Sequence, residues 1–380
     1  MDNLTHSLVG LAASKAGLEK LSPHATLVSV LAANAPDSDL VVLMFGDRWT
    51  FLEHHRGITH SIVGTLTLGI IVPLVFSLLE RLVAKLRGRR PAIKLKNLLV
   101  VSLIVGATHP LLDWTNNYGI RPLLPWSSRW FYGDFVFIID SVFWLVLGGA
   151  CFLLTAKTKL QVVIWLVVAS ILTALVIAVP AQRGFENQLL IRVCWLVAIT
   201  TCVLLFKLRV AQRFGNKIAV AAFALVVLYC GSLATIHQFA ISQARIQAQA
   251  IASQNGESVT DVAAMPTLAN PLQWTCVVET EQAAYRFELL LGIRQSAVEG
   301  PVRYERADTS TSAAVKRASR DRRAQIFLGF ARFPVFRTAG VDCVTGTLVQ
   351  FADLRYTQPG SARGSFSLEV PLDCPVEDAK

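Results

Sequence analysis

The chain has 380 residues, of which 53% are hydrophobic and only 16% are charged. A typical soluble domain carries about a quarter charged residues, so this composition argues against a soluble protein. The net charge is +10, but basic loops beside membrane spans account for part of it. We therefore expect a lipid bilayer as partner and no nucleic acid.

The first forty residues predict a short helical hairpin. Residues 7–18 are apolar but contain Lys15, and residues 24–46 are apolar but are interrupted by Asn34, Pro36, Asp37 and Asp39. Irregular backbone at membrane depth is tolerated only where protein or a cavity lines it. Two short helices fit this pattern better than one clean span.

Six apolar runs follow, and most approach the roughly 20 residues needed to cross about 30 Å of hydrocarbon. They cover residues 62–79, 97–112, 135–156, 160–181, 188–206 and 218–236. We predict a polytopic α-helical membrane protein, with a membrane domain over residues 1–240 of about six spans plus the N-terminal hairpin.

The loops after the first, third and fifth runs are the basic ones, for example "RLVAKLRGRRPAIKLK" after residue 80. Basic loops are retained in the cytoplasm. This orientation places His60 and His109 at the outer face of a bacterial inner (plasma) membrane. It also makes the chain after residue 240 periplasmic or extracellular.

Residues 241–380 have a different pattern and predict a small mostly-β soluble domain, preceded by a polar helix near residues 237–254. Runs rich in β-branched and aromatic residues alternate with Gly, Pro, Asp and Ser, which is typical of strands and turns. The runs are "WTCVVET", "YRFELLLG", "AQIFLGFARFPVF", "TGTLVQFADLRY" and "GSFSLEVPL".

Three of the seven histidines follow a threonine: His6 in "LTHSLVG", His60 in "ITHSIVG" and His109 in "GATHPLLDW". One interpretation is structural, because threonine is a reasonable helix N-cap. The glycine four residues later, Gly10 or Gly64, would then let another helix approach closely.

The other interpretation is a metal site. Asp113 follows His109 by four residues, so the two side chains share one helical face. Asp37 and Asp39 lie in an apolar hairpin, Asp134 opens the apolar run at 135–156, and Asp140 falls inside that run. Ionisable groups at membrane depth are candidates for a functional site. Imidazole and carboxylate without cysteine suit a divalent metal, with Zn expected first and Mn, Fe or Ni as alternatives.

Several motifs resemble the bacterial inner-membrane family of YdjM and YbcI, which is described as metal-dependent hydrolases. They are "MDNLTHSLVGLAASKAGL", "LAANAPDSD", "HRGITHS", "HPLLDWTNNYGIRPLLPWSSRWFYGDFVFIID" and, in the tail, "NPLQWTCVV". The resemblance covers the first 145 residues closely. It implies that the family's motif positions fall here on His6, Asn34, Asp37, Asp39, His55, Arg56, His60, His109, Asp113 and Asp140.

The favoured hypothesis is an integral membrane metal-dependent hydrolase that acts on phosphoester or acyl-ester lipids or envelope precursors. We expect four metal ligands: His6, His60, His109 and Asp113. We assign the catalytic roles to Asp37 or Asp39, as further ligand or general base, and to His55 and Arg56, which would position the substrate. Asn34 and Asp140 would contact the metal ligands and not the metal itself. The alternatives are a metal-ion transporter and a non-enzymatic membrane scaffold with an external binding module.

Overall fold

The computed structural model describes residues 1–182, 187–292, 301–340, 347–360 and 366–372. The chain forms two compact units. The first comprises Met1–Ser38 and Arg56–Ser232, and the second comprises Asp39–His55 and Leu233–Lys380. The domain boundary expected at residue 240 stays a prediction.

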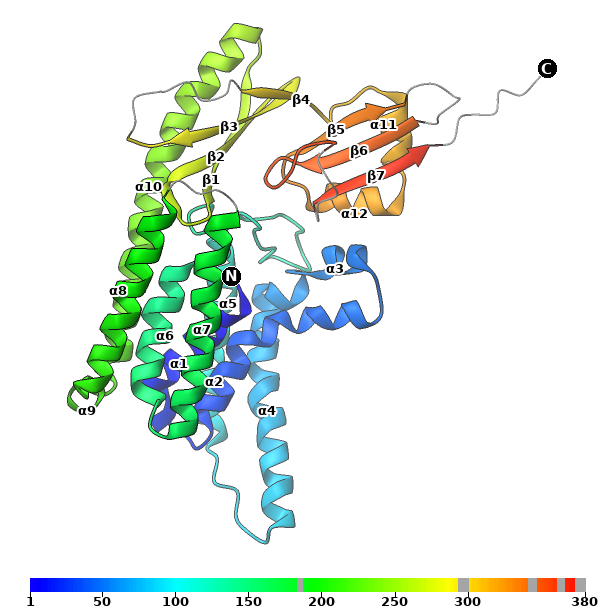
Figure 1. Cartoon of the computed structure of the whole chain (residues 1–380). Helices are drawn as coiled ribbons and strands as arrows, with labels where there is room; N and C mark the ends of the chain where they lie inside the picture. The colour runs from blue at the N-terminus through cyan, green and yellow to red at the C-terminus, as the bar shows by residue number, and fades with distance from the viewer. Residues whose placement is uncertain (183–186, 293–300, 341–346, 361–365, 373–380) are drawn as a thin grey trace. The chain divides into compact units, whose positions relative to one another are not determined.

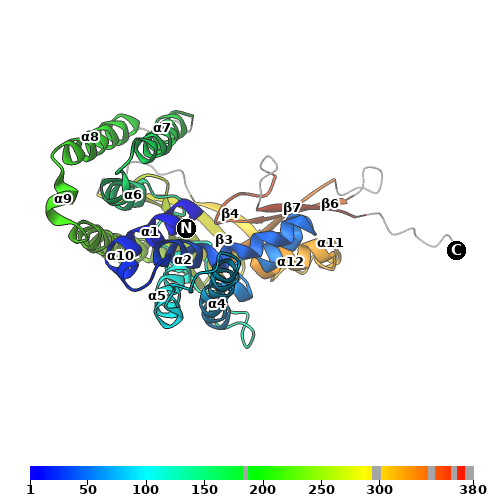
Figure 2. The same ribbon diagram turned by 90° about the horizontal axis from the view of Figure 1, so that it is seen from below.

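The first unit is helical (Figure 1). Helix α5 packs against α2 and α4, and α1 packs against α2 and α6; α4 and α5 lie side by side in both views (Figures 1 and 2). The helices are α1 (Asn3–Lys15), α2 (Ala25–Asn34), α4 (Ile62–Leu86), α5 (Leu95–Trp114), α6 (Ser141–Thr155), α7 (Lys159–Gln182), α8 (Gln188–Lys207), α9 (Val210–Phe214) and the first part of α10 (Lys217–Asn255). Short 3-10 helices of this unit are η1 (Leu18–Lys20) and η3 (Ile58–His60). A third, η2 (Ala35–Met44), continues α2, and its residues from Asp39 on belong to the second unit.

Six helical segments in the described part of the chain are long and apolar enough to cross a membrane: Ala25–Met44, Ile62–Leu86, Leu95–Trp114, Lys159–Gln182, Gln188–Lys207 and Lys217–Asn255. Together with the C-terminal sheet, they confirm the predicted fold class. One member of the set differs from the expectation. The second half of the N-terminal hairpin belongs to it, whereas α6 is a shorter apolar helix of 15 residues.

Two expectations around α6 were wrong. Asp140 does not lie inside the helix but is its N-cap, with its side chain accepting from the backbone N–H of Val142. Asp134 opens no helix and has a positive φ of 59°. Residues 135–139 are apolar and were counted with the span, but they belong to the loop that follows α5, so the helix begins later than hydropathy alone indicates.

The capping role expected for threonine was also wrong. The N-caps of α1 and α4 are Asp2 and Ser61, whose side chains accept from backbone N–H groups three residues later. Thr108 lies inside α5, where its hydroxyl donates to the Val105 carbonyl.

Gly10 allows the close packing of α1 on α2 that the sequence predicted. A Cβ at this position would lie 2.9 Å from three atoms of α2, which is too close for any side chain. Gly64 does not play this part. A Cβ there would lie 1.7 Å from the carbonyl oxygen of Ile58, so this glycine is packed against the turn that precedes its own helix.

The second unit contains an antiparallel sheet of seven strands in sequential order, which confirms the predicted β domain. Three alanines of α10, Ala240, Ala244 and Ala248, are fully buried in the core that also holds Trp274 and Tyr285. Their spacing of four residues puts a flat face of the helix against the sheet. The strands are β1 (Val259–Thr267), β2 (Asn270–Thr280), β3 (Ala283–Leu290), β4 (Val302–Arg306), β5 (Pro334–Ala339), β6 (Thr347–Asp353) and β7 (Ser367–Leu372).

Four of the five predicted strand runs coincide with β2, β3, β6 and β7. The fifth, residues 324–336, was wrong in its first half, because α12 (Arg322–Phe330) occupies it and β5 begins only at Pro334. The buried residues Ala324, Phe327 and Phe330 recur every three positions, which is a helical period. Two further short helices in this unit are α3 (Arg48–His54) and α11 (Ala313–Ala318).

Candidate metal centre

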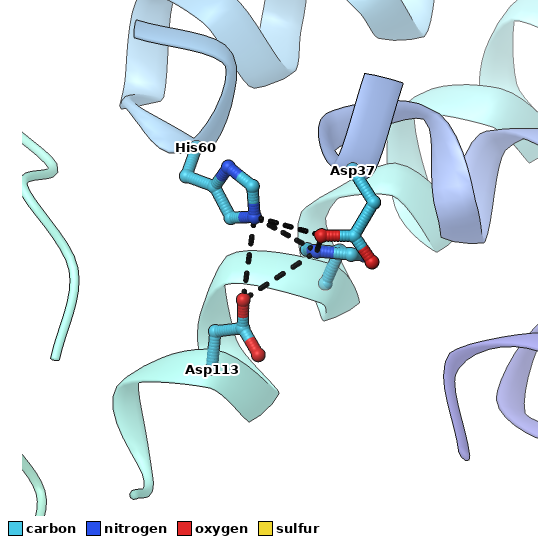
Figure 3. Close-up of side chains that lie close together, drawn as sticks. Asp37, His60 and Asp113 are labelled. Carbon is cyan, nitrogen blue, oxygen red and sulfur yellow. Dashed lines mark hydrogen bonds and ion pairs between the residues drawn. The ribbon is translucent and has the colours of Figure 1, made fainter. Parts of the chain in front are cut away.

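His60 and His109 are 49 residues apart in the chain, yet their Nε2 atoms lie 3.1 Å apart. His60 ends η3, two residues before α4 begins, and His109 lies in the last two turns of α5. Because α4 and α5 form an antiparallel pair, the start of one meets the end of the other. Asp113 is one turn beyond His109, and Asp37 enters from the first turn of η2. Figure 3 shows the Asp37, His60 and Asp113 side chains pointing toward one another.

One ligand atom from each of these four side chains lies within 4.8 Å of the other three, and the group could hold a metal ion. The His60 Nε2 atom lies 3.3 Å from Asp37 Oδ1 and 3.3 Å from Asp113 Oδ2. The His109 Nε2 atom lies 3.4 and 3.5 Å from the same two oxygens. All four side chains are buried, with 8% or less exposed. We call this group, Asp37, His60, His109 and Asp113, the four-ligand cluster.

These separations fit the edges of a ligand tetrahedron. Four ligands at the 2.0–2.1 Å typical of zinc lie about 3.3–3.4 Å from one another. Five of the six separations in the four-ligand cluster range from 3.1 to 3.5 Å, and all four ligand atoms lie within 4.8 Å of one another. The donor–acceptor distance of an N–H···O hydrogen bond is most often about 2.9–3.0 Å. Four of these five separations are therefore longer than ordinary hydrogen bonds.

The position of the ring hydrogen on His109 also favours binding of a cation in the cluster. His109 Nδ1 lies 2.6 Å from the carbonyl oxygen of Ala33, and a carbonyl can only accept, so Nδ1 carries the hydrogen. In the neutral ring Nε2 is then a bare lone pair. A lone pair that faces a second imidazole and two carboxylate oxygens is suited to a metal, and a backbone carbonyl behind the ring is the usual way to orient such a ligand.

Arg56 holds the other side of Asp113. Its Nη2 donates to Asp113 Oδ1 at 3.0 Å, and its Nη1 donates to Asn116 Oδ1 at 3.0 Å and to the Gly119 carbonyl at 3.1 Å. The guanidinium stacks on Tyr118, 4.6 Å from the ring centroid, and is only 2% exposed. The geometry thus ties Arg56 to Asp113 and to the loop after α5, whereas the sequence suggested contact with substrate.

His6 lies next to the four-ligand cluster but its ligand atoms are not part of it. Its ring stacks on His109 with centroids 3.7 Å apart, and its Nε2 lies 3.4 Å from Asp113 Oδ1. The side chain is 1% exposed. Asp113 therefore faces His60 and His109 with Oδ2, and His6, Arg56 and the amino group of Met1 with Oδ1.

The remaining sequence candidates are not members of the four-ligand cluster. Asn34 donates to Ser7 and to the Val30 carbonyl, which links α1 to α2. Asp140 accepts from the hydroxyl of Tyr229 at 2.8 Å. Asp39 and His55 belong to the second unit, where Asp39 Oδ1 lies 3.2 Å from His55 Nδ1. The catalytic and supporting roles assigned to these residues stay predictions.

Two residues that contribute to the site were not predicted from the sequence. Asn116 is fully buried and accepts from both Arg56 and the Tyr118 backbone N–H. The signal was an amide pair, "NN", directly after the histidine–aspartate helix. The hydroxyl of Thr59 lies 3.0 Å from His60 Nδ1, so this threonine serves its neighbouring histidine and not a helix end.

The helices and the buried cluster define a multi-pass membrane protein with a His/Asp group that could hold a metal ion of unknown identity. Residues 1–184 match the profile of the YdjM inner membrane protein family. This part of the chain, which contains every candidate site residue, belongs to that family, and the protein is a multi-pass inner-membrane protein.

Two relatives show how far this sequence has diverged from known proteins. YbcI, an inner membrane protein of Escherichia coli (strain K12), is 29% identical over 158 residues, which cover 41% of this chain and 80% of YbcI. YfhP of Bacillus subtilis (strain 168), described as uncharacterized, is 29% identical over 140 residues, which cover 34% of this chain and only 39% of YfhP. No solved structure matches the chain.

Proposed function

We propose that this protein is an integral membrane metal-dependent hydrolase that cleaves phosphoester or acyl-ester bonds of lipids or envelope precursors. The observation that carries the proposal is the set of separations within the four-ligand cluster, which has the size of a tetrahedral metal site. Zinc is the first expectation, since two imidazoles and two carboxylates suit it, with Mn, Fe or Ni as alternatives.

A divalent ion held there would supply Lewis acidity and lower the pKa of a bound water toward neutrality. The chain's own residues have separate tasks. His60, His109, Asp37 and Asp113 would bind the ion, the Ala33 carbonyl fixes the tautomer of His109, and Arg56 orients Asp113. Hydrolysis would add hydroxyl to the acyl carbon or phosphorus, break its bond to the ester oxygen, and return a proton to the leaving oxygen.

The position of the cluster along the helices favours a hydrolase over a transporter. Transporter sites lie near the middle of the bilayer, whereas His60 lies two residues before the start of α4 and Asp113 is the next-to-last residue of α5. The basic loop between Leu86 and Leu95 is at the other end of this helix pair. By the positive-inside rule that loop is cytoplasmic, so we propose that the cluster opens at the outer face and that the β domain is periplasmic.

The first test is the metal content of purified protein. We expect about one equivalent of Zn, Mn, Fe or Ni by plasma mass spectrometry, and its loss in His60→Ala/His109→Ala. The matched control is His24→Ala/His54→Ala, which removes two exposed histidines outside the cluster. Absence of metal from wild type after supply of each divalent ion would refute the proposal and favour a non-enzymatic scaffold.

The second test separates hydrolysis from transport. Esters of 4-nitrophenol with acyl chains, and 4-nitrophenyl alkyl phosphodiesters, report hydrolysis directly, and the release should vanish in folded His60→Ala. Metal binding without hydrolysis of either class, together with metal uptake into proteoliposomes, would establish the transporter instead.

A further inference from the structure

An apolar cavity adjoins the four-ligand cluster. It has a volume of about 420 Å³ and lies between the start of α4, the end of α5 and the loop after α5. This size is within the roughly 300–1,000 Å³ typical of small-molecule sites. His60 belongs to its wall, so one side chain borders both the cavity and the cluster.

The lining determines what the cavity can accept. Apart from His60 and Thr65, its wall is made of aliphatic, proline and aromatic residues, among them Leu66, Leu111 and Phe131. A buried water needs two to four polar partners, and this wall offers few. The cavity therefore suits a hydrocarbon group better than water or a polar group.

The rim indicates where that group comes from. Ile62, Leu66, Leu111 and Trp114 line the cavity and are also 40–62% exposed on the surface of the helical unit. Ile62 and Leu66 belong to α4, and Leu111 and Trp114 to α5, both of which are long and apolar enough to span the membrane. Exposed apolar side chains of such helices face lipid tails, so the neighbouring molecules at this opening are hydrocarbon chains.

We propose that this cavity binds the hydrocarbon chain of the substrate, so that the enzyme acts on single lipid molecules taken from the bilayer. The inference rests on the proposed hydrolase function and narrows its substrate to an amphiphile with an acyl or alkyl chain. The chain occupies the space between α4 and α5, and the bond to be cleaved lies on the His60 side. For a probe that starts in water, burial of each methylene contributes about 0.8 kcal/mol, which corresponds to a factor of about four.

The test of substrate choice uses 4-nitrophenyl acyl esters and 4-nitrophenyl alkyl phosphodiesters of two to twelve carbons, with full-length protein in nanodiscs. We expect kcat/KM to rise about fourfold per methylene until the cavity is full. Leu111→Trp fills the cavity and should flatten this dependence. Ile104→Trp is the matched control, because Ile104 lies seven residues earlier on the same face of α5, is 54% exposed and does not line the cavity. Ala107→Leu, a smaller change at another lining position, serves as the second test variant if Leu111→Trp does not fold.

The test of chain binding does not depend on turnover. A dodecanol carrying a diazirine is photolysed with the protein, and labelled peptides are mapped by mass spectrometry. We expect saturable labelling of the peptides around Leu66 and Leu111, competed by dodecanol but not by butanol, and reduced in Leu111→Trp. Metal content, measured in the same samples, should be the same in all variants.

The outcomes are distinct. Saturable labelling with a chain-length dependence that Leu111→Trp abolishes supports the proposal. Hydrolysis that is independent of chain length, or equally dependent on it in Leu111→Trp, overturns the chain site and leaves the hydrolase intact. Saturable labelling without any hydrolysis overturns the substrate role together with the proposed function. Non-saturable labelling spread over all lipid-facing helices overturns the chain site by itself.

Discussion

Replacement of Arg56 by lysine probes how strongly the protein holds Asp113 in place. Lysine keeps the positive charge but replaces a planar fork with a single ammonium group. The guanidinium donates to the Asp113 side chain and carbonyl, to Asn116 and to the Gly119 carbonyl. Arg56 has a φ of 52°, but lysine pays the same conformational cost there, so the comparison isolates the side-chain bonds.

The expected loss follows from the bonds that an ammonium cannot reproduce. If lysine keeps only the contact with Asp113 Oδ1, three bonds to buried acceptors are lost at about 1 kcal/mol each. Arg56→Lys should therefore lower the free energy of unfolding of the metal-free protein by about 3 kcal/mol. Arg56→Met also leaves the Asp113 charge without its buried partner and should cost about 3–5 kcal/mol. Residues that orient metal ligands typically change metal affinity 10–100-fold, so we expect metal binding to Arg56→Lys to weaken by that factor.

The assay is unfolding by SDS titration in the presence of a chelator, followed by far-UV circular dichroism, with metal affinity measured separately by competition with a chromogenic chelator. Arg129→Lys is the control, because Arg129 is exposed in the loop after α5 and stacks only loosely on Phe131 at 5.3 Å. It should change the free energy of unfolding by less than about 0.5 kcal/mol. An Arg56→Lys variant as stable as this control, with unchanged metal affinity and a raised KM, would refute the positioning role and restore Arg56 as a substrate contact.

Three further predictions concern other parts of the molecule. Gly10→Ala should lower the free energy of unfolding by about 1–3 kcal/mol, because its Cβ would meet three atoms of α2 at 2.9 Å. Gly148→Ala is the control and should leave the free energy of unfolding unchanged, because the nearest contact of its Cβ is at 3.7 Å. Thermal unfolding compares the two variants. Burial raises the pKa of Glu279 in β2 from 4.5 to about 7. The unfolded state thus releases this proton first, and stability should fall as the pH rises from about 4.5 to 7, by at most about 1.4 kcal/mol per pH unit, in wild type but not in Glu279→Gln. Removal of metal by a chelator should cost wild type about 2.7 kcal/mol of stability if the metal was present at 100 times its Kd, and equal chelator effects on wild type and Asp113→Asn would contradict the assignment of that ligand.

The local parts of the site could be predicted from the sequence. A spacing of four residues put His109 and Asp113 on one helical face, and the recurrence of Thr-His singled out His60 as their companion. The contact between His60 and His109 also required that α4 and α5 form an antiparallel pair, which hydropathy indicates only as two successive spans. The structure brings their Nε2 atoms to 3.1 Å. Asp37 was expected as a further ligand or a base. Its position beside the other ligands depends on the fold of the hairpin at η2, which the periodicity of the sequence does not specify.

Other features depended on competition that single residues do not reveal. Threonine can cap a helix, but Asp2 and Ser61 are placed to do so at α1 and α4. The threonine hydroxyls then serve other partners, such as His60 Nδ1 for Thr59. The run at 324–336 was read as a strand because aromatic residues are common in strands, yet burial of Phe327 and Phe330 on one side stabilises a helix.

The last two turns of α5 combine two environments in one short segment. His109 and Asp113 point into the unit and are at most 1% exposed, whereas Leu111 and Trp114 line the cavity and are 62% and 40% exposed. Residues two apart on a helix project in different directions, so one segment can present ligands to a metal on one side and hydrocarbon on the other. The two properties should therefore separate by mutation. Substitution of His109 or Asp113 should remove metal and leave labelling by the alkyl probe, and substitution of Leu111 should do the reverse.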